Sequence, residues 1–211
     1  MSRKIFDITF PISNELPKWP DSWDYDYGFR LKTPMAVANS SYFSMDSHYG
    51  THIDAPYHFV HDGAKVDELP LDNLIGDAFV ASITNRNTIT KNELSHLEIP
   101  DDCKILLLKT DNEKLWKRNE NAFYENFVGL DQSAANWLVE KKINLIGIDY
   151  LSIQKFHDGP EVHQILLEND IMILESLKMD MVQEGTYDFI CLPLKLKGME
   201  AAPVRVILME K

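Results

Sequence analysis

Apolar residues along the chain fall into short runs that are separated by polar turns. Residues 5–10 alternate apolar and polar side chains, which predicts a strand that ends at Pro11. Continuous apolar runs predict buried strands at residues 77–84, 105–109 and 144–150. The first two thirds of the chain are therefore expected to be rich in strands.

The second half of the chain adds helices between strands. Residues 131–141 place Ala134, Trp137 and Leu138 on the apolar side of an expected amphipathic helix. A second helix is expected at residues 161–168, and further strands are expected at residues 171–175, 188–194 and 204–209. Because helices are interspersed among more numerous strands, we predict one continuous α/β domain over residues 1–211 with a mixed central sheet.

One segment is expected to be a loop over a small-molecule site. Residues 14–34 contain three prolines and two tryptophans, which favours irregular structure. Aromatic-rich loops often cover binding sites, so Trp19 and Trp23 are candidates for a lid. The alternative is that both indoles pack on the surface of the core.

Composition and charge exclude several classes of function. The net charge of −12, without any run of Lys or Arg, argues against a nucleic-acid partner. No apolar segment approaches the ~20 residues that cross a bilayer, and no membrane association is expected. Cys103 and Cys191 lie in apolar runs and are interpreted as buried thiols in a reducing compartment. We expect a cytoplasmic protein.

The densest group of reactive side chains lies in residues 47–59, SHYGTHIDAPYHF. It contains His48, His52, Asp54 and His58, all at even positions. Side chains alternate between the two faces of an extended strand, so an extended backbone would place all four on one side. A face this polar would be costly to bury without a cation, which predicts a metal site.

The spacing within this segment suits a metal ion. His52 and Asp54 would stand about 6.6 Å apart along a strand, and their side chains could converge on one ion at roughly 2.0–2.2 Å. Gly50 and Pro56 lie where bends would bring in the two flanking histidines. Imidazole and carboxylate together suit zinc, and also manganese or ferrous iron.

Other positions could complete such a centre. His163 opens one expected helix, and Glu175 and Asp149 each end an expected strand, where α/β folds commonly place functional side chains. His157 and Arg205 are further candidates whose contribution the sequence leaves open.

The pattern H-x-G-T-H-x-D-x-P-x-H over 48–58 resembles that of the metal-dependent cyclase family, which includes bacterial kynurenine formamidases and isatin hydrolases. The similarity continues through LLLKT at 106–110, GIDYLS at 147–152 and the C-terminal segment at 192–208. The pair His163 and Glu175, twelve residues apart, resembles the distal metal pair of this family.

This resemblance implies a fold, a cofactor and an assembly. The fold would be a swivelling β/β/α domain, assembled into homodimers or homotetramers. One or two zinc ions, with manganese as an alternative, would be bound by His48, His52, Asp54, His163 and Glu175. Asp54 would be able to bridge two ions, and His58 would act as the general acid/base.

The resemblance also implies hydrolysis of an arylformamide such as N-formylkynurenine, with Trp19 as a candidate to stack on the aromatic ring. The chain departs from the family at WPDSWDYDYG and at SLKMDM, both near the expected substrate, so a cyclic amide such as isatin, or a lactone, is an alternative. His52, Asp54 and His163 also mimic the two-histidine, one-carboxylate set of non-haem iron oxygenases. A non-catalytic metal-binding protein is the remaining alternative.

Overall fold

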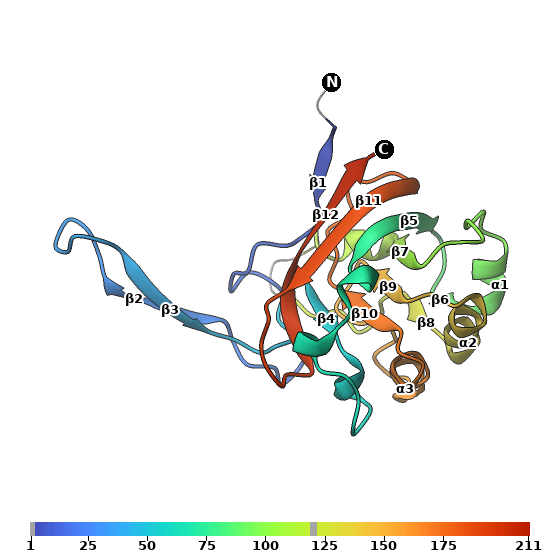
Figure 1. The fold of residues 1–211 in the computed structure, drawn as a ribbon, viewed down its shortest axis with the longest axis horizontal. Coiled ribbons are helices and arrows are strands. Elements are labelled where there is room, and N and C mark those ends of the chain that lie inside the picture. The colour runs from blue at the N-terminus through green and yellow to red at the C-terminus, as the bar shows by residue number, and fades with distance from the viewer. Residues whose placement is uncertain (1–2, 119–121) are drawn as a thin grey trace.

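The computed structural model, described for residues 3–118 and 122–211, is built on a mixed sheet that closes on itself (Figure 1). Closure occurs because β12 (Ala201–Glu210) pairs with β11 (Gly185–Pro193) on one edge and with β4 (His52–Asp54) on the other. From β11, the ring of strands continues through β5 (Ile75–Ile83), β7 (Ile105–Thr110), β9 (Leu145–Ile148) and β10 (Met172–Glu175) back to β4. The result is a barrel-like core.

The sheet combines parallel and antiparallel pairs. The pairs β5–β7, β7–β9 and β9–β10 are parallel, and the remaining pairs of the main sheet are antiparallel. β1 (Ile5–Asp7) is added antiparallel to the outer edge of β12. The expected α/β fold with a mixed central sheet is confirmed, whereas the swivelling β/β/α arrangement stays a prediction.

Alternate residues of the central strands supply two separate cores. On β7, Ile105 and Leu107 point into the barrel, whereas Leu106 and Leu108 pack against the helical layer. Because this strand is buried on both faces, it is continuously apolar rather than alternating. The helical layer consists of α1 (Lys91–Ser95), α2 (Gln132–Lys141) and α3 (Glu161–Glu168) on one side of the sheet (Figure 1).

The predicted elements are found with small shifts at their ends. The second expected helix has the predicted bounds, and the first begins after Asp131, whose carboxylate caps it by accepting from the Ala134 N–H at 2.9 Å. The first strand ends at Asp7 rather than at Phe10, because the Thr9 backbone bridges to Leu177 and only its hydroxyl bonds to Val206 of β12.

Short elements that the pattern did not predict complete the described chain. Two short strands, β6 (Thr88–Ile89) and β8 (Gly129–Leu130), pair in parallel. Single turns of 3-10 helix lie at Pro56–His58, Val66–Glu68, Leu71–Asn73 and Asp111–Lys114. Cys103 and Cys191 are buried free thiols, as predicted. Within residues 3–118 and 122–211, no helix is both long and apolar enough to cross a membrane.

The prediction that residues 14–34 form a loop is wrong for Asp26–Leu31. β2 (Asp26–Leu31) pairs antiparallel with β3 (Ser40–Ser44), and the two strands project from the body as a long ribbon (Figure 1). Tyr27, Phe29 and Leu31 alternate with Gly28 and Arg30, which is a strand pattern. The surrounding prolines obscured this alternation in the sequence.

The core between the sheet and the helical layer allows a direct test of the packing. Leu106 is fully buried between the sheet and the helical layer, so Leu106→Ala should lower the free energy of unfolding by about 2–5 kcal/mol. Urea denaturation followed by circular dichroism measures this loss. The matched change Leu71→Ala, at a side chain that is 60% exposed, should cost less than about 0.5 kcal/mol. Equal effects of the two substitutions would contradict the assigned burial.

Candidate metal centre

The centre is built on β4, which lies between β10 and β12. His52 and Asp54 are two residues apart on this strand, so their side chains leave it on the same face. The antiparallel register places Glu175 of β10 directly opposite His52. The Nε2 atom of His52 consequently lies 3.4 Å from a Glu175 oxygen and 3.5 Å from an Asp54 oxygen.

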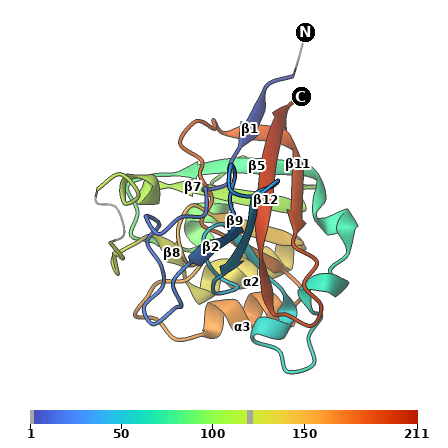
Figure 2. The ribbon, with the colours of Figure 1, turned by 90° about the vertical axis from the view of Figure 1, so that its left-hand side faces the viewer.

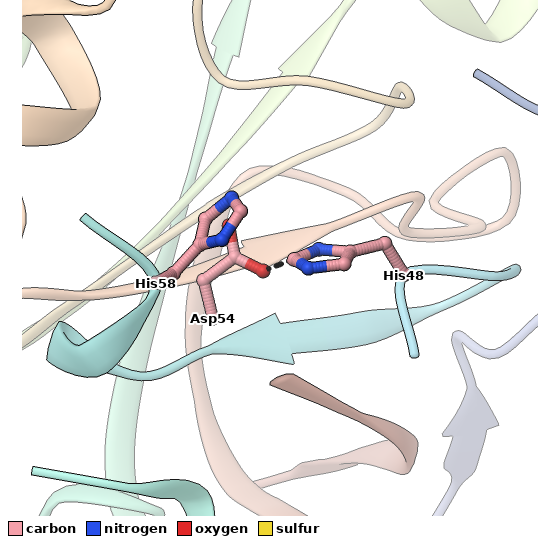
Figure 3. Close-up of side chains that lie close together, drawn as sticks. All are labelled: His48, Asp54 and His58. Atoms are coloured by element: carbon pink, nitrogen blue, oxygen red, sulfur yellow. Dashed lines mark ion pairs between the residues drawn. The ribbon is translucent and has the colours of Figure 1, made fainter. Parts of the chain in front are cut away.

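His48 and His58 reach the same place from bends on either side of β4 (Figure 3). Gly50 adopts a φ of 70°, in the left-handed region that favours glycine, and Pro56 begins a 3-10 turn that ends at His58. The Nδ1 atom of His48 lies 3.0 Å from an Asp54 oxygen, and the His48 and His58 rings are 4.4 Å apart. The bends expected at Gly50 and Pro56 are therefore present, whereas the strand itself carries only two of the four side chains.

His163 enters from the first turn of α3. Its Nε2 atom lies 3.3 Å from Glu175 Oε1 and 3.9 Å from Asp54 Oδ2. All five residues that were expected to bind metal thus meet in one buried cluster, together with His58.

The buried polar atoms of this cluster fit a cation. Among the described residues, His52 Nε2 and both carboxylate oxygens of Asp54 are buried without a hydrogen-bond partner, although the His48 ring lies close to Asp54. Unpaired buried carboxylate oxygens are costly, and a divalent ion would satisfy them.

Two groups of potential ligands share Asp54. One consists of His48, Asp54 and His58, and the other of His52, Asp54 and Glu175; within each group the ligand atoms lie within 4.8 Å of one another. The donor set of imidazoles and carboxylates suits zinc or manganese. The residues present therefore fit one ion or two, with Asp54 common to both positions.

The pKa shifts within the cluster also indicate that its buried carboxylates favour a nearby positive charge. Burial disfavours the protonated form of His48, but the carboxylates of Asp54, Glu200 and Glu175 raise its pKa to about 10. Burial opposes ionisation of Asp54 as well, yet the histidines around it hold its pKa well below the usual range. For His58, burial and the neighbouring His48 and His163 lower the pKa.

Hydrogen bonds outside the cluster orient its imidazoles. The Nδ1 atom of His52 lies 2.9 Å from the Gly50 carbonyl oxygen, which can only accept, so Nδ1 carries the proton and Nε2 is left free. Similarly, His163 Nδ1 lies 2.8 Å from the side-chain oxygen of Gln154. Such partners fix the ring orientation of metal-binding histidines and raise their basicity.

The cluster lines a pocket of about 350 Å³. Trp19, Phe59 and Leu151 contribute apolar walls. Trp19 is held edge-on against Phe123 and Phe156, at ring distances of 5.4 and 5.1 Å. A pocket with both apolar walls and a polar cluster suits a small substrate with a ring and a reactive polar group.

Comparison with known proteins gives matches over nearly the whole chain. The sequence model of the cyclase family matches residues 6–155. The chain belongs to the cyclase family. This confirms the family that the histidine-rich pattern resembles.

Other members of the cyclase family are similar over most of their length. The cyclase-like protein 3 of Arabidopsis thaliana is 38% identical, over 99% of this chain and 80% of that protein. The kynurenine formamidase of Bacillus cereus is 32% identical, over 96% of this chain and 95% of that protein. A solved structure titled as a potential metal-dependent hydrolase with cyclase activity superposes with a TM-score of 0.85 at 34% identity, covering 100% of this chain and 99% of that one.

Four residues whose contribution to the site the sequence left open do not line the pocket. Asp149 is buried and accepts hydrogen bonds from the Thr110 N–H and hydroxyl, and burial raises its pKa to about 6. These hydrogen bonds connect the end of β7 with the residue that follows β9. His157 is exposed beside Glu125, Arg205 forms a surface ion pair with Asp7, and Trp23 is 76% exposed.

Two polar residues that contact the histidines of the cluster, and the apolar residues Phe59 and Leu151 of the pocket, were not predicted from the sequence. Glu200, just before β12, lies 3.5 Å from His48 Nε2 and accepts from the Ser47 hydroxyl at 2.6 Å. Its contact with His48 lowers the Glu200 pKa to about 2. Gln154 orients His163, as described above. Neither had a recognisable spacing, although Glu200 falls within the C-terminal segment that resembles the family.

Gln154 provides a test of the outer contacts in this cyclase-family site. Gln154→Ala removes the acceptor of His163 Nδ1, so we expect metal affinity to fall roughly tenfold to a hundredfold. Competition with a chromogenic chelator measures this change. Gln132→Ala, at the exposed start of α2, is the control and should leave the affinity unchanged. Unchanged affinity in Gln154→Ala would show that His163 does not depend on this contact.

Proposed function

We propose that this chain is a metal-dependent hydrolase that cleaves the amide bond of a small aromatic substrate. An arylformamide such as N-formylkynurenine is the specific substrate proposed. The observation that carries the proposal is the Asp54 carboxylate, whose oxygens are buried without a hydrogen-bond partner among the described residues. It is shared by two groups of potential metal ligands that line a substrate-sized pocket.

The metal-binding residues would be His48, His52, Asp54, His163 and Glu175, holding one or two divalent ions, zinc or manganese. A divalent metal ion bound there supplies Lewis acidity, which polarises an amide carbonyl and activates water near neutral pH. The protein keeps these ligands oriented: the Gly50 carbonyl contacts the His52 ring, and the Gln154 side chain contacts the His163 ring.

His58 is proposed as the general acid/base. It lies at the end of a 3-10 turn, with its ring centre 4.4 Å from that of His48 and 6.1 Å from that of His163. Amide hydrolysis requires a proton to leave the attacking water and to reach the departing nitrogen. A histidine that lines the pocket can accept this proton from the water and donate it to the departing nitrogen.

The aromatic part of the substrate would lie along Trp19, Phe59 and Leu151. A flat ring packs favourably against indole and phenyl groups, by roughly 0.5–1.5 kcal/mol for each aromatic pair beyond the area that it buries. Trp19 is suited to this role because Phe123 and Phe156 already hold its indole in place. The relative named kynurenine formamidase supports an arylformamide substrate.

A small substrate panel tests this proposal. The purified chain is assayed with N-formylkynurenine, isatin and an aromatic lactone, each with and without added zinc or manganese. The proposal predicts that the formamide has the largest kcat/KM and that Trp19→Ala raises KM more than it lowers kcat. A preference for isatin or the lactone would overturn the proposed substrate, and turnover that requires dioxygen would overturn hydrolysis itself.

A further inference from the structure

The lining of the pocket contains a carboxylate that the proposed mechanism does not use. Among the described residues, three acids line the pocket: Asp54 and Glu175 belong to the metal cluster, and Asp46 does not. Asp46 is half-buried in the segment between β3 and β4. A carboxylate in a pocket attracts cationic ligands and repels anionic ones, so Asp46 bears on which substrates can bind.

One oxygen of this carboxylate is engaged and the other is available. Asp46 Oδ1 accepts a hydrogen bond from the His48 backbone N–H at 3.1 Å, which stabilises the turn before β4. Within residues 3–118 and 122–211, Oδ2 has no hydrogen-bond partner and the side chain forms no ion pair. The carboxylate therefore keeps an unpaired negative charge and an acceptor oxygen for a ligand.

The pocket has no lysine or arginine that could offset this charge. Neither residue type is present in the part of its lining that the structure describes. Lys18 is close to the lining in the chain, but its Nζ lies 2.7 Å from Asp24 and donates to the Ser22 carbonyl oxygen at 2.7 Å. The imidazole of His48 lies 3.0 Å from Asp54 and is engaged there. A substrate carboxylate would therefore find no free cationic side chain, whereas an ammonium would find an acceptor.

We propose that Asp46 binds an ammonium group of the substrate and so selects substrates that carry a positive charge away from the bond to be cleaved. This inference rests on the proposed function, because it names the class of arylformamide that the pocket accepts. An alkylammonium has three N–H donors, one of which would go to Asp46 Oδ2. The Ser22 hydroxyl is a second acceptor, since it lines the same pocket and its oxygen has no hydrogen-bond partner among the described residues.

The pocket can hold both ends of such a substrate. His48 and His58 approach Asp54 from opposite ends of β4 (Figure 3), and Asp46 precedes β4 on the His48 side. The segment before β2, which brings Ser22 into the lining, crosses the side of the body that faces the viewer in Figure 2. A substrate with its amide near His58 can consequently extend an ammonium-bearing chain toward Asp46.

The simplest alternative is that Asp46 serves only the turn before His48. An Asn at this position would serve that turn equally well, because its side-chain oxygen accepts the same backbone N–H. Asp46→Asn therefore removes the negative charge and keeps the turn. This substitution separates a role in ammonium binding from a purely structural role.

Isothermal titration calorimetry with two matched ligands tests the proposal. Each ligand has an ortho-aminobenzoyl group on an ethyl chain, which ends in an ammonium in one ligand and in a carboxylate in the other. Both resemble products of formamide cleavage, so their binding does not depend on turnover. We expect the metal-loaded protein to bind the amine at least about tenfold more tightly, which is the effect of one hydrogen bond to a charged group.

The substitution Asp46→Asn then assigns this preference to one residue. We expect it to raise the Kd of the amine about tenfold and not to raise the Kd of the carboxylate. Asp62→Asn, the same change at a side chain that is 97% exposed, is the control and should change neither Kd. Circular dichroism and metal content are measured on each variant.

Three results would overturn the ammonium subsite. The first, which requires no variant to fold, is equal binding of the two ligands or a preference for the carboxylate by the unaltered protein. The others are an unchanged amine Kd in a folded Asp46→Asn variant and an equal weakening of both ligands in that variant. Turnover of the N-formyl form of the amine is measured separately. Absence of hydrolysis while the amine preference holds would overturn the proposed function but not the subsite.

Discussion

Replacing Asp54 with Asn should abolish metal binding and hydrolysis together. Asp54 is the residue common to both groups of potential ligands, and both of its oxygens are buried without a hydrogen-bond partner among the described residues. The amide of Asn has no charge and offers only one acceptor oxygen. Loss of an outer contact alone costs 10–100-fold in metal affinity, so we expect a loss larger than ~100-fold here.

Elemental analysis and a hydrolysis assay of the same preparation measure both effects. Asp62→Asn makes the same chemical change at an exposed position and should leave metal content and turnover unchanged. Circular dichroism separates loss of metal from loss of fold. Full metal occupancy in Asp54→Asn would contradict the assignment of Asp54 as a ligand.

Replacing His58 with Ala should leave the metal in place while turnover falls by about 10²–10⁴-fold. The expectation rests on His58 being the one histidine of the cluster that the proposed ligand set does not need. The test distinguishes two roles, because the potential ligand atoms of His58, His48 and Asp54 lie within 4.8 Å of one another and His58 could itself bind the ion. Metal content and kcat therefore have to be measured together.

The matched control is His61→Ala, since His61 is almost fully exposed in the following loop. It should change neither quantity. If His58→Ala lost its metal, His58 would be a ligand rather than a proton carrier. If it kept both metal and turnover, His58 would have no part in the reaction.

The sequence predicted the fold best where strands are buried on both faces. Continuous apolar runs such as ILLL of β7 and LIGI of β9 are typical of central strands, and both strands lie in the interior of the main sheet. The closure of the sheet could not be predicted, because it depends on β12 being long enough to pair with β11 at one end and with β4 at the other. Such long-range pairing leaves no local pattern.

The candidate site was predicted from local spacing and from the family resemblance. The separation of His52 and Asp54 followed from the strand period, and the bends at Gly50 and Pro56 followed from their backbone preferences. Glu200 could not be found in this way, because its approach to His48 is created by folding of the C-terminal hairpin. Spacing and resemblance therefore predicted the residues that meet in the cluster but not Glu200, which contacts it.

The ribbon of β2 and β3 was not predicted, although the alternating residues of β2 are present in the sequence. The neighbouring prolines and tryptophans favoured a loop instead. Trp19 does line the pocket, as expected of a cover, whereas the segment after Asp26 turns away from the body. Local composition cannot distinguish a lid from a projecting ribbon, because the difference lies in what each contacts.

The most direct measurement is the metal content of the purified protein followed through removal and return of the ion. We expect at least one equivalent of zinc or manganese per chain. Hydrolysis of N-formylkynurenine should fall in proportion as a chelator removes the ion, and should recover as the ion is returned. A metal-free preparation that hydrolyses the substrate at full rate, or a folded protein that takes up no divalent ion, would contradict the proposed metal-dependent hydrolysis.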